Sequence, residues 1–372
     1  MSEKIPKGWK WVKLGEVAEI VKDIVNPNEF DDLNYIGLEH IGQENLRIIS
    51  IGKSREVNST KYLFKPNDIL FGKLRPYFRK VVKPKFNGIC STDIWVFRAK
   101  QGYDQNYLYY FLANWDFVNL ASSGEGGTRM PRADWNYLKQ TEWIFPPLPE
   151  QKAIAEVLSS IDDKIDLLHR QNKTLEEMAM TLFRQWFIEP TKDELPEGWE
   201  EVRLGEIIEI SSGKSIEKGK LKEKGLYPVL GANGEIGRTD DWLYEGELIY
   251  TGRVGTLGNV FIVFRNEKVW LTDNTLVIKP NKNEYFYFVY FTLKNAKLDE
   301  YNSGSTQPLI RQSDIKKIEI FLPKINFLKD FEIISRNIFI KIQFNTSQIQ
   351  TLDKLRDTLL PKLMSGELRV KV

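Results

Sequence analysis

Basic side chains are concentrated in one stretch of this sequence, between Gly52 and Lys85. Ten Lys and Arg residues lie there against two acidic ones, Glu56 and Asp68, with aromatic residues interleaved. Lys and Arg supply phosphate contacts, and an Arg guanidinium can also bind the guanine edge in a major groove. The stretch therefore predicts binding to a polyanion. A solvated basic face over an aromatic core is the alternative.

The candidate contacts to phosphates or bases follow from residue type and from position in an internal repeat. In the first half they are Lys73, Arg75, Arg79, Lys80 and Arg129, and in the second half Lys214, Arg238, Arg253 and Arg311. Arg129 ends the glycine-rich segment 123–129, which could offer backbone N–H groups to a phosphate. A simple turn would explain the same glycines.

Signatures of catalysis are scarce. The only Pro-Pro pair, Pro146-Pro147, follows Phe145, so the Asn/Asp-Pro-Pro-aromatic motif of an amino-methyltransferase is absent, and no GxxxxGK[ST] phosphate loop occurs. Two histidines give little material for metal binding or acid–base chemistry. The composition favours a binding protein. A magnesium-dependent nuclease with scattered Asp and Glu ligands remains the competing hypothesis.

Composition also restricts the setting of the protein. With 42% hydrophobic and 28% charged residues the chain is globular, and its net charge of +2 indicates no partner by itself. The single Cys90 allows no internal disulfide, which fits a reducing cytoplasm. No apolar run reaches the length of a membrane span. We expect a cytoplasmic protein without a membrane partner.

An internal repeat must position the candidate residues. The opening Pro6-Lys7-Gly8-Trp9 returns at Pro196-Glu197-Gly198-Trp199, an offset of 190, and later matches fall at offsets of 179 to 180. After Pro146 and Pro323 the offset becomes 177. Each half therefore has a globular segment of mixed α/β character followed by a long helix.

Apolar residues at steps of three to four predict one helix over 151–187 and a second from Phe331 to Leu359, ending near Pro361 and Gly366. Each apolar stripe needs a partner, and the obvious partner is the other helix. Folding of each helix onto its own globular segment is the alternative. The predicted seam consists of Ile154, Ile161, Ile165, Leu168, Leu175, Leu182, Ile338, Ile342, Ile349, Leu352 and Leu359.

Three features together resemble the specificity subunit of type I restriction–modification systems. They are the paired Pro-x-Gly-Trp…Leu-Gly-Glu openings, the segment Pro146-Pro147-Leu148-Pro149-Glu150-Gln151, and the ending from Leu355 through Leu359-Leu360-Pro361-Lys362 to Leu368. The resemblance covers essentially the whole chain. Residues 323–327, Pro-Lys-Ile-Asn-Phe, depart from the Pro-Pro-Leu-Pro-Glu-Gln form, which leaves the start of the second helix open.

The resemblance implies an α+β fold with two pseudo-symmetric α/β target recognition domains, 1–148 and 191–324. The long helices, 149–190 and 325–372, would form an antiparallel coiled coil between them. Each domain would recognise half of a bipartite, asymmetric site in double-stranded DNA. The implied partners are two methylase subunits and restriction subunits. S-adenosylmethionine, ATP and magnesium would be held by those partners, with no cofactor in this chain. The repeat also predicts that a fragment ending near Ile188 forms homodimers through its helix.

Overall fold

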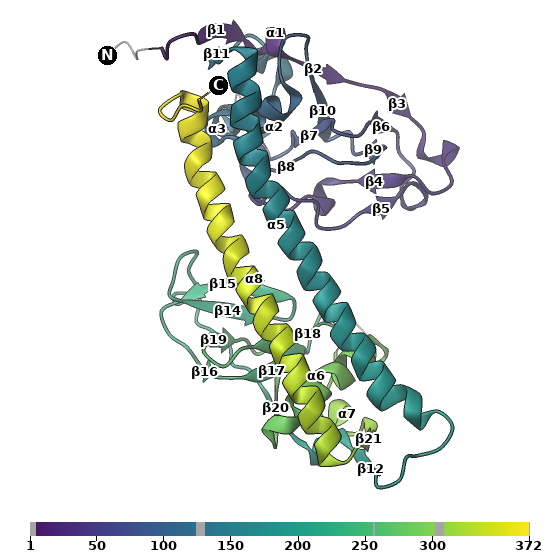
Figure 1. Ribbon diagram of the computed structural model, residues 1–372. Helices are drawn as coiled ribbons and strands as arrows, with labels where there is room; N and C mark the ends of the chain where they lie inside the picture. Colours follow the sequence, from purple (N-terminus) through teal and green to yellow (C-terminus); the bar gives the residue numbers. More distant parts are fainter. Residues whose placement is uncertain (1–4, 124–130, 256, 302–308, 372) are drawn as a thin grey trace. The chain divides into compact units, whose positions relative to one another are not determined.

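The computed structural model describes residues 5–123, 131–255, 257–301 and 309–371 (Figure 1). The chain forms two compact units. Unit 1 contains residues 1–169 and 346–372, and unit 2 contains residues 170–345. Each unit combines one globular segment with parts of both long helices, so each helix contributes to both units.

The globular segment of unit 1 is mainly β-structure with a small helical group. Its strands are β1 Lys10–Lys13, β2 Ala18–Val21, β3 Ile24–Val25, β4 Asn34–Ile36, β5 Gly52–Lys53, β6 Lys61–Phe64, β7 Ile69–Gly72, β8 Val81–Val82, β9 Gly88–Cys90, β10 Ile94–Ala99 and β11 Glu142–Phe145. Its helices are α1 Leu14–Val17, α2 Gln105–Ala113, α3 Trp115–Ser122 and α4 Trp135–Leu138. A 3₁₀ turn, η4 Pro76–Phe78, lies between β7 and β8.

The globular segment of unit 2 has the same general composition. Its strands are β12 Glu200–Arg203, β13 Ile208–Ser212, β14 Tyr227–Gly231, β15 Gly234–Thr239, β16 Tyr244–Glu245, β17 Leu248–Gly252, β18 Val260–Val263, β19 Lys268–Leu271, β20 Thr275–Pro280 and β21 Glu319–Leu322. Its helices are α6 Phe286–Asn295 and α7 Gln312–Lys316.

A four-stranded antiparallel sheet recurs in both units. Its order is β2-β10-β7-β8 in unit 1 and β13-β20-β17-β18 in unit 2. In both units the first and last strands of the segment also pair, β1 with β11 and β12 with β21. The central strands β7 and β17 are buried along their whole length, which explains why both are continuous apolar runs. The repeat in sequence is therefore a repeat in topology.

A second sheet differs between the units. Unit 1 has five strands in the order β3-β6-β9-β4-β5, whereas unit 2 has four in the order β15-β14-β19-β16. Both contain one parallel pair, β4 with β9 and β14 with β19. The segments that form these sheets are also those in which the sequence repeat is hardest to follow. The two units thus share one framework and diverge in an added sheet.

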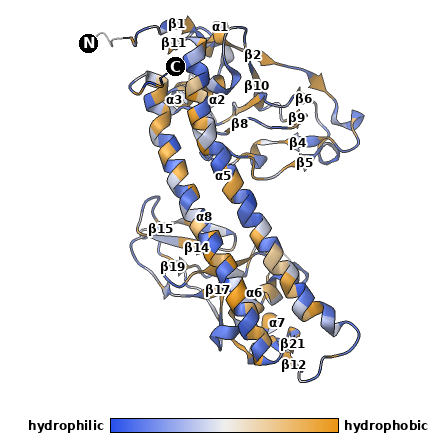
Figure 2. Cartoon of the chain, in the orientation of Figure 1, coloured by the Kyte–Doolittle hydropathy of each residue, from blue (hydrophilic) through white to orange (hydrophobic). Residues whose placement is uncertain are grey.

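The long helices are α5 Leu148–Phe183, which continues into a π-helical turn at Arg184–Ile188, and α8 Ile325–Ser365. Figure 2 shows hydrophobic and hydrophilic residues alternating along both. In unit 1 the beginning of α5 packs beside the end of α8, since Ile161, Ile165 and Leu168 form one buried cluster with Ile349. The helices are therefore antiparallel there.

The same arrangement occurs in unit 2, between the end of α5 and the beginning of α8. The Phe183 ring lies 6.1 Å from that of Phe331, and Asn345 Nδ2 donates a 2.9 Å hydrogen bond to Asn172 Oδ1. Both phenylalanines also belong to the core of the globular segment, with Phe288 and Phe291. Each helix therefore packs against the other helix and against the globular segment, which combines the two packing modes expected from the sequence.

The second helix ends where the sequence predicts, since α8 ends at Ser365, directly before Gly366, although Pro361 lies inside it. Only one further turn follows, and Leu363 and Met364 in that turn are buried in the unit 1 core, which compensates for the lost backbone hydrogen bond. Residues 105–122 form two helices, α2 and α3, because Asn114 between them has an extended backbone and its side chain binds Asp116.

Candidate nucleic-acid interface

Lys73 and Arg253 occupy the same place in the two units, directly after the central strands β7 and β17. The Lys73 N–H donates to the carbonyl of Asp93, and the Arg253 N–H donates to that of Asn274. Their own carbonyls accept hydrogen bonds from Ala133 (2.9 Å) and Ile310 (3.0 Å). The framework thus presents one basic side chain at an equivalent backbone position in each unit.

Around Lys73, unit 1 gathers further cationic groups. Arg132 is mostly exposed and lies 3.2 Å from Asp93, and its backbone forms an isolated β-bridge with Leu74. Burial lowers the pKa of Lys73, with Arg132 and Lys22 acting in the same direction and Asp93 opposing them. Neighbouring cations repel each other, and the negative charge of a phosphate bound between them offsets that repulsion. Lys73 and Arg132 therefore form the first part of a candidate anion site.

Arg75 lies in the loop between β7 and β8, which also contains Lys73. Its backbone is left-handed, at φ 52°, and its N–H donates to Pro131 at 2.8 Å. A left-handed conformation is uncommon for a residue with a side chain, and such strain concentrates at functional loops. Tyr77, in the following 3₁₀ turn, is exposed and packs on the Phe78 ring. The β7–β8 loop thus exposes an aromatic ring close in sequence to a half-buried arginine.

The prediction that Arg79 contacts DNA is wrong. Its side chain is only 1% exposed, and its guanidinium donates to the carbonyls of Ala113 and Glu44 and to Asp357 on α8. Burial lowers its pKa while Asp357 opposes that effect. A guanidinium enclosed in this way has no free donor edge for a phosphate, so Arg79 has a structural role.

The remaining candidates of unit 1 give no further contact. Lys80 is half-buried, and its ammonium donates to the carbonyl of Leu38. Burial lowers its pKa. Arg129 lies outside the described residues.

In unit 2, polar side chains meet beside Arg253. Its Nη1 lies 3.4 Å from the Ser212 hydroxyl, which also accepts a 3.1 Å hydrogen bond from Gln312 Nε2. Arg253 Nε is buried without a partner among the described residues. Guanidinium, hydroxyl and amide groups together suit the hydrogen-bonding edges of bases and phosphates. This cluster is the unit 2 counterpart of the Lys73 site.

The other unit 2 candidates differ from one another. Lys214 and Arg311 are exposed. The Lys214 N–H donates to the carbonyl of Leu271 at the end of β19, and Arg311 lies immediately before α7. Arg238, by contrast, donates to the carbonyls of Gly225 and Leu226 and to Glu235. Its guanidinium holds a loop against β15, so its observed role is structural.

The basic stretch 52–85 does not form a single free patch. Lys53 and Arg55 pair with Asp32, Lys85 pairs with Asp163, and Lys61 is buried. Local charge in the sequence therefore overestimates the cationic surface, because acidic residues distant in sequence neutralise part of it.

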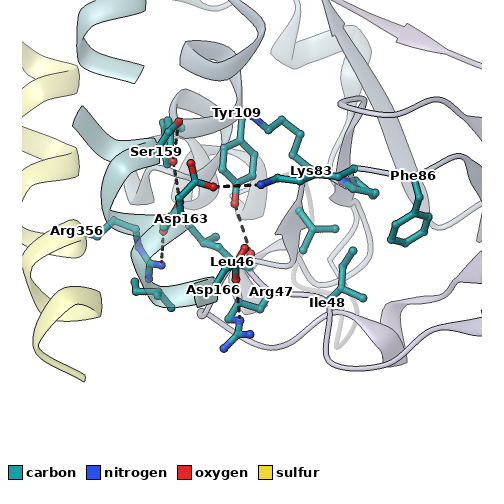
Figure 3. A pocket seen from close by; sticks show the side chains of 16 residues that line it. Leu46, Arg47, Ile48, Lys83, Phe86, Tyr109, Ser159, Asp163, Asp166 and Arg356 are labelled. Atoms are coloured by element: carbon teal, nitrogen blue, oxygen red, sulfur yellow. Dashed lines mark hydrogen bonds and ion pairs between the residues drawn. The ribbon is translucent and has the colours of Figure 1, made fainter. Parts of the chain in front are cut away.

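A cavity of about 300 Å³ lies in unit 1 between α5, β8 and the loop around Arg47 (Figure 3). Arg47 approaches Asp166 at 3.7 Å, and Arg356 of α8 binds Asp162 at 3.0 Å. Burial raises the pKa of Asp162, and Arg356 opposes this. Because these charges are paired internally, we assign the cavity to the packing of the helices on the globular segment and not to DNA binding.

Most of the predicted seam residues lie in or against buried apolar clusters. Ile161, Ile165, Leu168 and Ile349 form one cluster, with Leu352 and Leu359 packed against it. Ile154 belongs to the main core of unit 1, whereas Leu182, Ile338 and Ile342 pack on the core of unit 2. Leu175 is half-buried.

Three polar residues of the candidate sites were not predicted from sequence: Arg132, Ser212 and Gln312. Arg132 closely follows the glycine-rich segment and could have been found by its neighbourhood. Ser212 and Gln312 are 100 residues apart, and only the fold brings them together.

Two further searches cover only the described part of the chain. No helix in it is long and apolar enough to cross a membrane. No group of three or more His, Cys, Asp or Glu side chains in these ranges is arranged to hold a metal ion.

Comparison with known proteins gives consistent matches. A family model for the type I restriction modification DNA specificity domain matches residues 6–177 and 196–353. The chain is 31% identical over 307 residues to the type I restriction enzyme MjaIX specificity subunit of Methanocaldococcus jannaschii, covering 73% of this chain and 71% of that protein. The MjaVIII specificity subunit of the same organism is 24% identical over 99% of this chain and 95% of its own.

The fold has a solved counterpart. A type I restriction–modification S subunit from M. genitalium superimposes with a TM-score of 0.59 at 20% identity, covering 98% of this chain and 97% of the other. At this level of identity the likeness concerns the fold alone.

Proposed function

Because this chain belongs to the family of type I restriction–modification DNA specificity proteins, we propose that its two target recognition domains bind the two halves of a bipartite, asymmetric site in double-stranded DNA. The chain is the specificity subunit, a DNA-recognition protein and not the catalyst. The proposed domains are 1–148 and 191–324, and the helices 149–190 and 325–372 set the spacing between the half-sites. The relatives reported above are named specificity subunits and give the magnesium-dependent nuclease alternative no support.

The observation that carries this proposal is the equivalence of Lys73 and Arg253. Each follows the central strand of its unit. The backbone of each residue forms hydrogen bonds with two segments that are equivalent in the two units. Lys73 lies beside Arg132, and Arg253 lies beside Ser212 and Gln312. Equivalent placement with different neighbours suits two domains that dock alike on a duplex and recognise different bases. Lys73, Arg75, Lys214, Arg253 and Arg311 are the proposed contacts.

The partners follow from the family. We propose that two methylase subunits bind the helices and the recognition domains, and that restriction subunits complete a complex acting in the cytoplasm. S-adenosylmethionine, ATP and magnesium would bind to those partner subunits. This chain would select the DNA sequence and position the partner subunits on it.

Mapping of methylated adenines tests the proposal. DNA exposed to the reconstituted methylase complex should carry modified adenines in two different short sequences at a constant separation. Replacement of residues 196–324 by the same segment of a relative should change one sequence and leave the other unchanged. Changes in both sequences, or in neither, would contradict the assignment of one half-site to each domain.

A further inference from the structure

A chain of four charged groups connects three elements of unit 1. Arg79 binds Asp357 at 3.1 Å, Asp357 lies 3.4 Å from Arg356, and Arg356 binds Asp162 at 3.0 Å. The two middle members are adjacent on α8, while Arg79 and Asp162 come from the first half of the sequence. Asp353, also on α8, lies 3.1 Å from Arg356. The outer members therefore depend on α8 for their opposite charges.

The repeat identifies the corresponding positions in unit 2. The helix offset of 177 carries Asp162 onto Phe339, since 339 − 162 = 177, and Ala179 and Met180 onto Arg356 and Asp357, since 356 − 179 = 177. Ala179 and Phe339 are buried in the unit 2 core, with Met180 packed against it. A site that is charged in unit 1 is therefore apolar in unit 2.

A second pair of positions shows the reverse pattern. In unit 2 the Asn345 side chain is completely buried and binds Asn172. The same offset carries Asn172 onto Ile349 and Leu168 onto Asn345, since 349 − 172 = 345 − 168 = 177. Leu168 and Ile349 share the apolar cluster of unit 1. Here the polar pair lies in unit 2 and the apolar pair in unit 1.

Pairing of a helix with its own copy would mismatch both positions. Two copies of α5 would place Ala179 and Met180 where Arg356 and Asp357 belong, leaving the buried Arg79 and the half-buried Asp162 without these opposite charges. Asn172 would then face Leu168. Two copies of α8 would place Arg356 against Phe339 and Asn345 against Ile349. Buried charges and amides without partners disfavour both arrangements strongly.

We propose that these polar positions form a pairing code, which selects α5 with α8 and rejects pairing of either helix with a second copy of itself. A buried asparagine or charge that specifies partner and register at some cost in stability is well established in coiled coils. The proposal predicts the opposite of the sequence-based expectation that a fragment ending near Ile188 forms homodimers.

The test measures how often the two halves of the complete chain pair with each other and how often each pairs with a second copy of itself. A protease site is placed in the exposed linker 192–195, and the folded protein is cut, dissociated in urea and refolded. Native mass spectrometry then counts the pairs. We expect pairs of like halves to be at least about tenfold rarer than random pairing gives. A random mixture of like and unlike pairs would overturn the proposal.

A matched variant removes two pairs of the code, Asp162–Arg356 and Asn172–Asn345, and keeps Arg79–Asp357. The substitutions Asp162→Phe, Arg356→Ala, Asn172→Ile and Asn345→Leu give equivalent positions the same residues in both helices. Pairs of like halves should then increase at least about tenfold. The control K173E/E177K reverses an exposed ion pair on α5 and should leave the distribution unchanged. Equal distributions for the fourfold variant and the control would contradict the code.

A second measurement uses the uncut chain and does not depend on refolding of the halves. Urea unfolding of D162F, R356A and the double variant D162F/R356A forms a double-mutant cycle. The double variant should be more stable than the sum of the single effects, by at least about fivefold in the unfolding equilibrium. Additive single effects would show that Asp162 and Arg356 do not select each other.

Discussion

The fates of Lys73 and Arg79 show what decides the role of a single basic residue. Both lie in the same basic stretch, and their residue types gave no reason to separate them. Arg79 is enclosed because Asp357, 278 residues later, provides a carboxylate at 3.1 Å. Lys73 is only half-buried and lies near Arg132 and Lys22 as well as Asp93. A partner distant in sequence, rather than local charge, separates a structural arginine from a candidate DNA contact.

Removal of the Asp357 charge tests this role. Asp357→Asn should lower the free energy of unfolding by about 2 kcal/mol, because the buried Arg79 loses its carboxylate partner. The exposed pair of Asp163 with Lys85 provides the control, and Asp163→Asn should change stability by less than about 1 kcal/mol. Urea unfolding of the intact chain measures both. Equal effects would mean that Arg79 does not require Asp357.

Glu332 predicts a dependence of stability on pH. Burial raises its pKa above the ordinary 4.5, although hydrogen bonds from Tyr287 N–H and Arg336 oppose the shift. A carboxyl group with a raised folded pKa stabilises most below its unfolded pKa, and this contribution is lost as pH rises through the folded pKa. Glu332→Gln should therefore flatten the decrease in stability above about pH 4.5.

Urea midpoints measured from pH 4 to pH 7 would show the difference, in about the range where the carboxyl group titrates. The exposed Glu177 gives the control, since Glu177→Gln should leave the slope unchanged. An unchanged slope in Glu332→Gln would contradict the direction of the shift.

At the scale of elements, periodicity predicted what depends on local pattern. The continuous apolar runs of β7 and β17 and the stripes of α5 and α8 were all recognisable. The sequence pattern does not reveal that Pro361 is accommodated inside α8, because the burial of Leu363 and Met364 in the unit 1 core decides it. The second sheets were also missed, since they consist of short strands with little periodicity.

The helix seam can be tested on a single element. Ile349→Ala should destabilise the chain by about 3 kcal/mol, because Ile349 is 6% exposed and its removal leaves a cavity beside Ile165 and Leu168. Leu355 on the same helix is 44% exposed, and Leu355→Ala should cost less than about 1 kcal/mol. Urea unfolding distinguishes the two. A small loss for Ile349→Ala would mean that the seam contributes little.

At the scale of the whole molecule, the repeat supplies information that no single residue carries. It relates Lys73 to Arg253, and it also relates the charged pair Asp162–Arg356 to the apolar pair Phe339–Ala179. The first relation joins residues of similar chemistry at the docking position that we propose for both units. The second joins residues of opposite chemistry and distinguishes the halves. The two halves thus share one framework and differ in the second sheet and in polar positions on the long helices.

If both halves bind one DNA molecule, weakening either half should weaken the whole complex. Lys73→Gln and Arg253→Gln should each reduce the affinity of the reconstituted complex for its site, and each should lower the salt slope by about one. Since the two residues lie in different units, their losses should add in free energy in the double variant. Lys192→Gln removes the same charge from the linker and should have little effect. A double variant no weaker than the weaker single variant would show that the two positions do not contribute independently to one bipartite site.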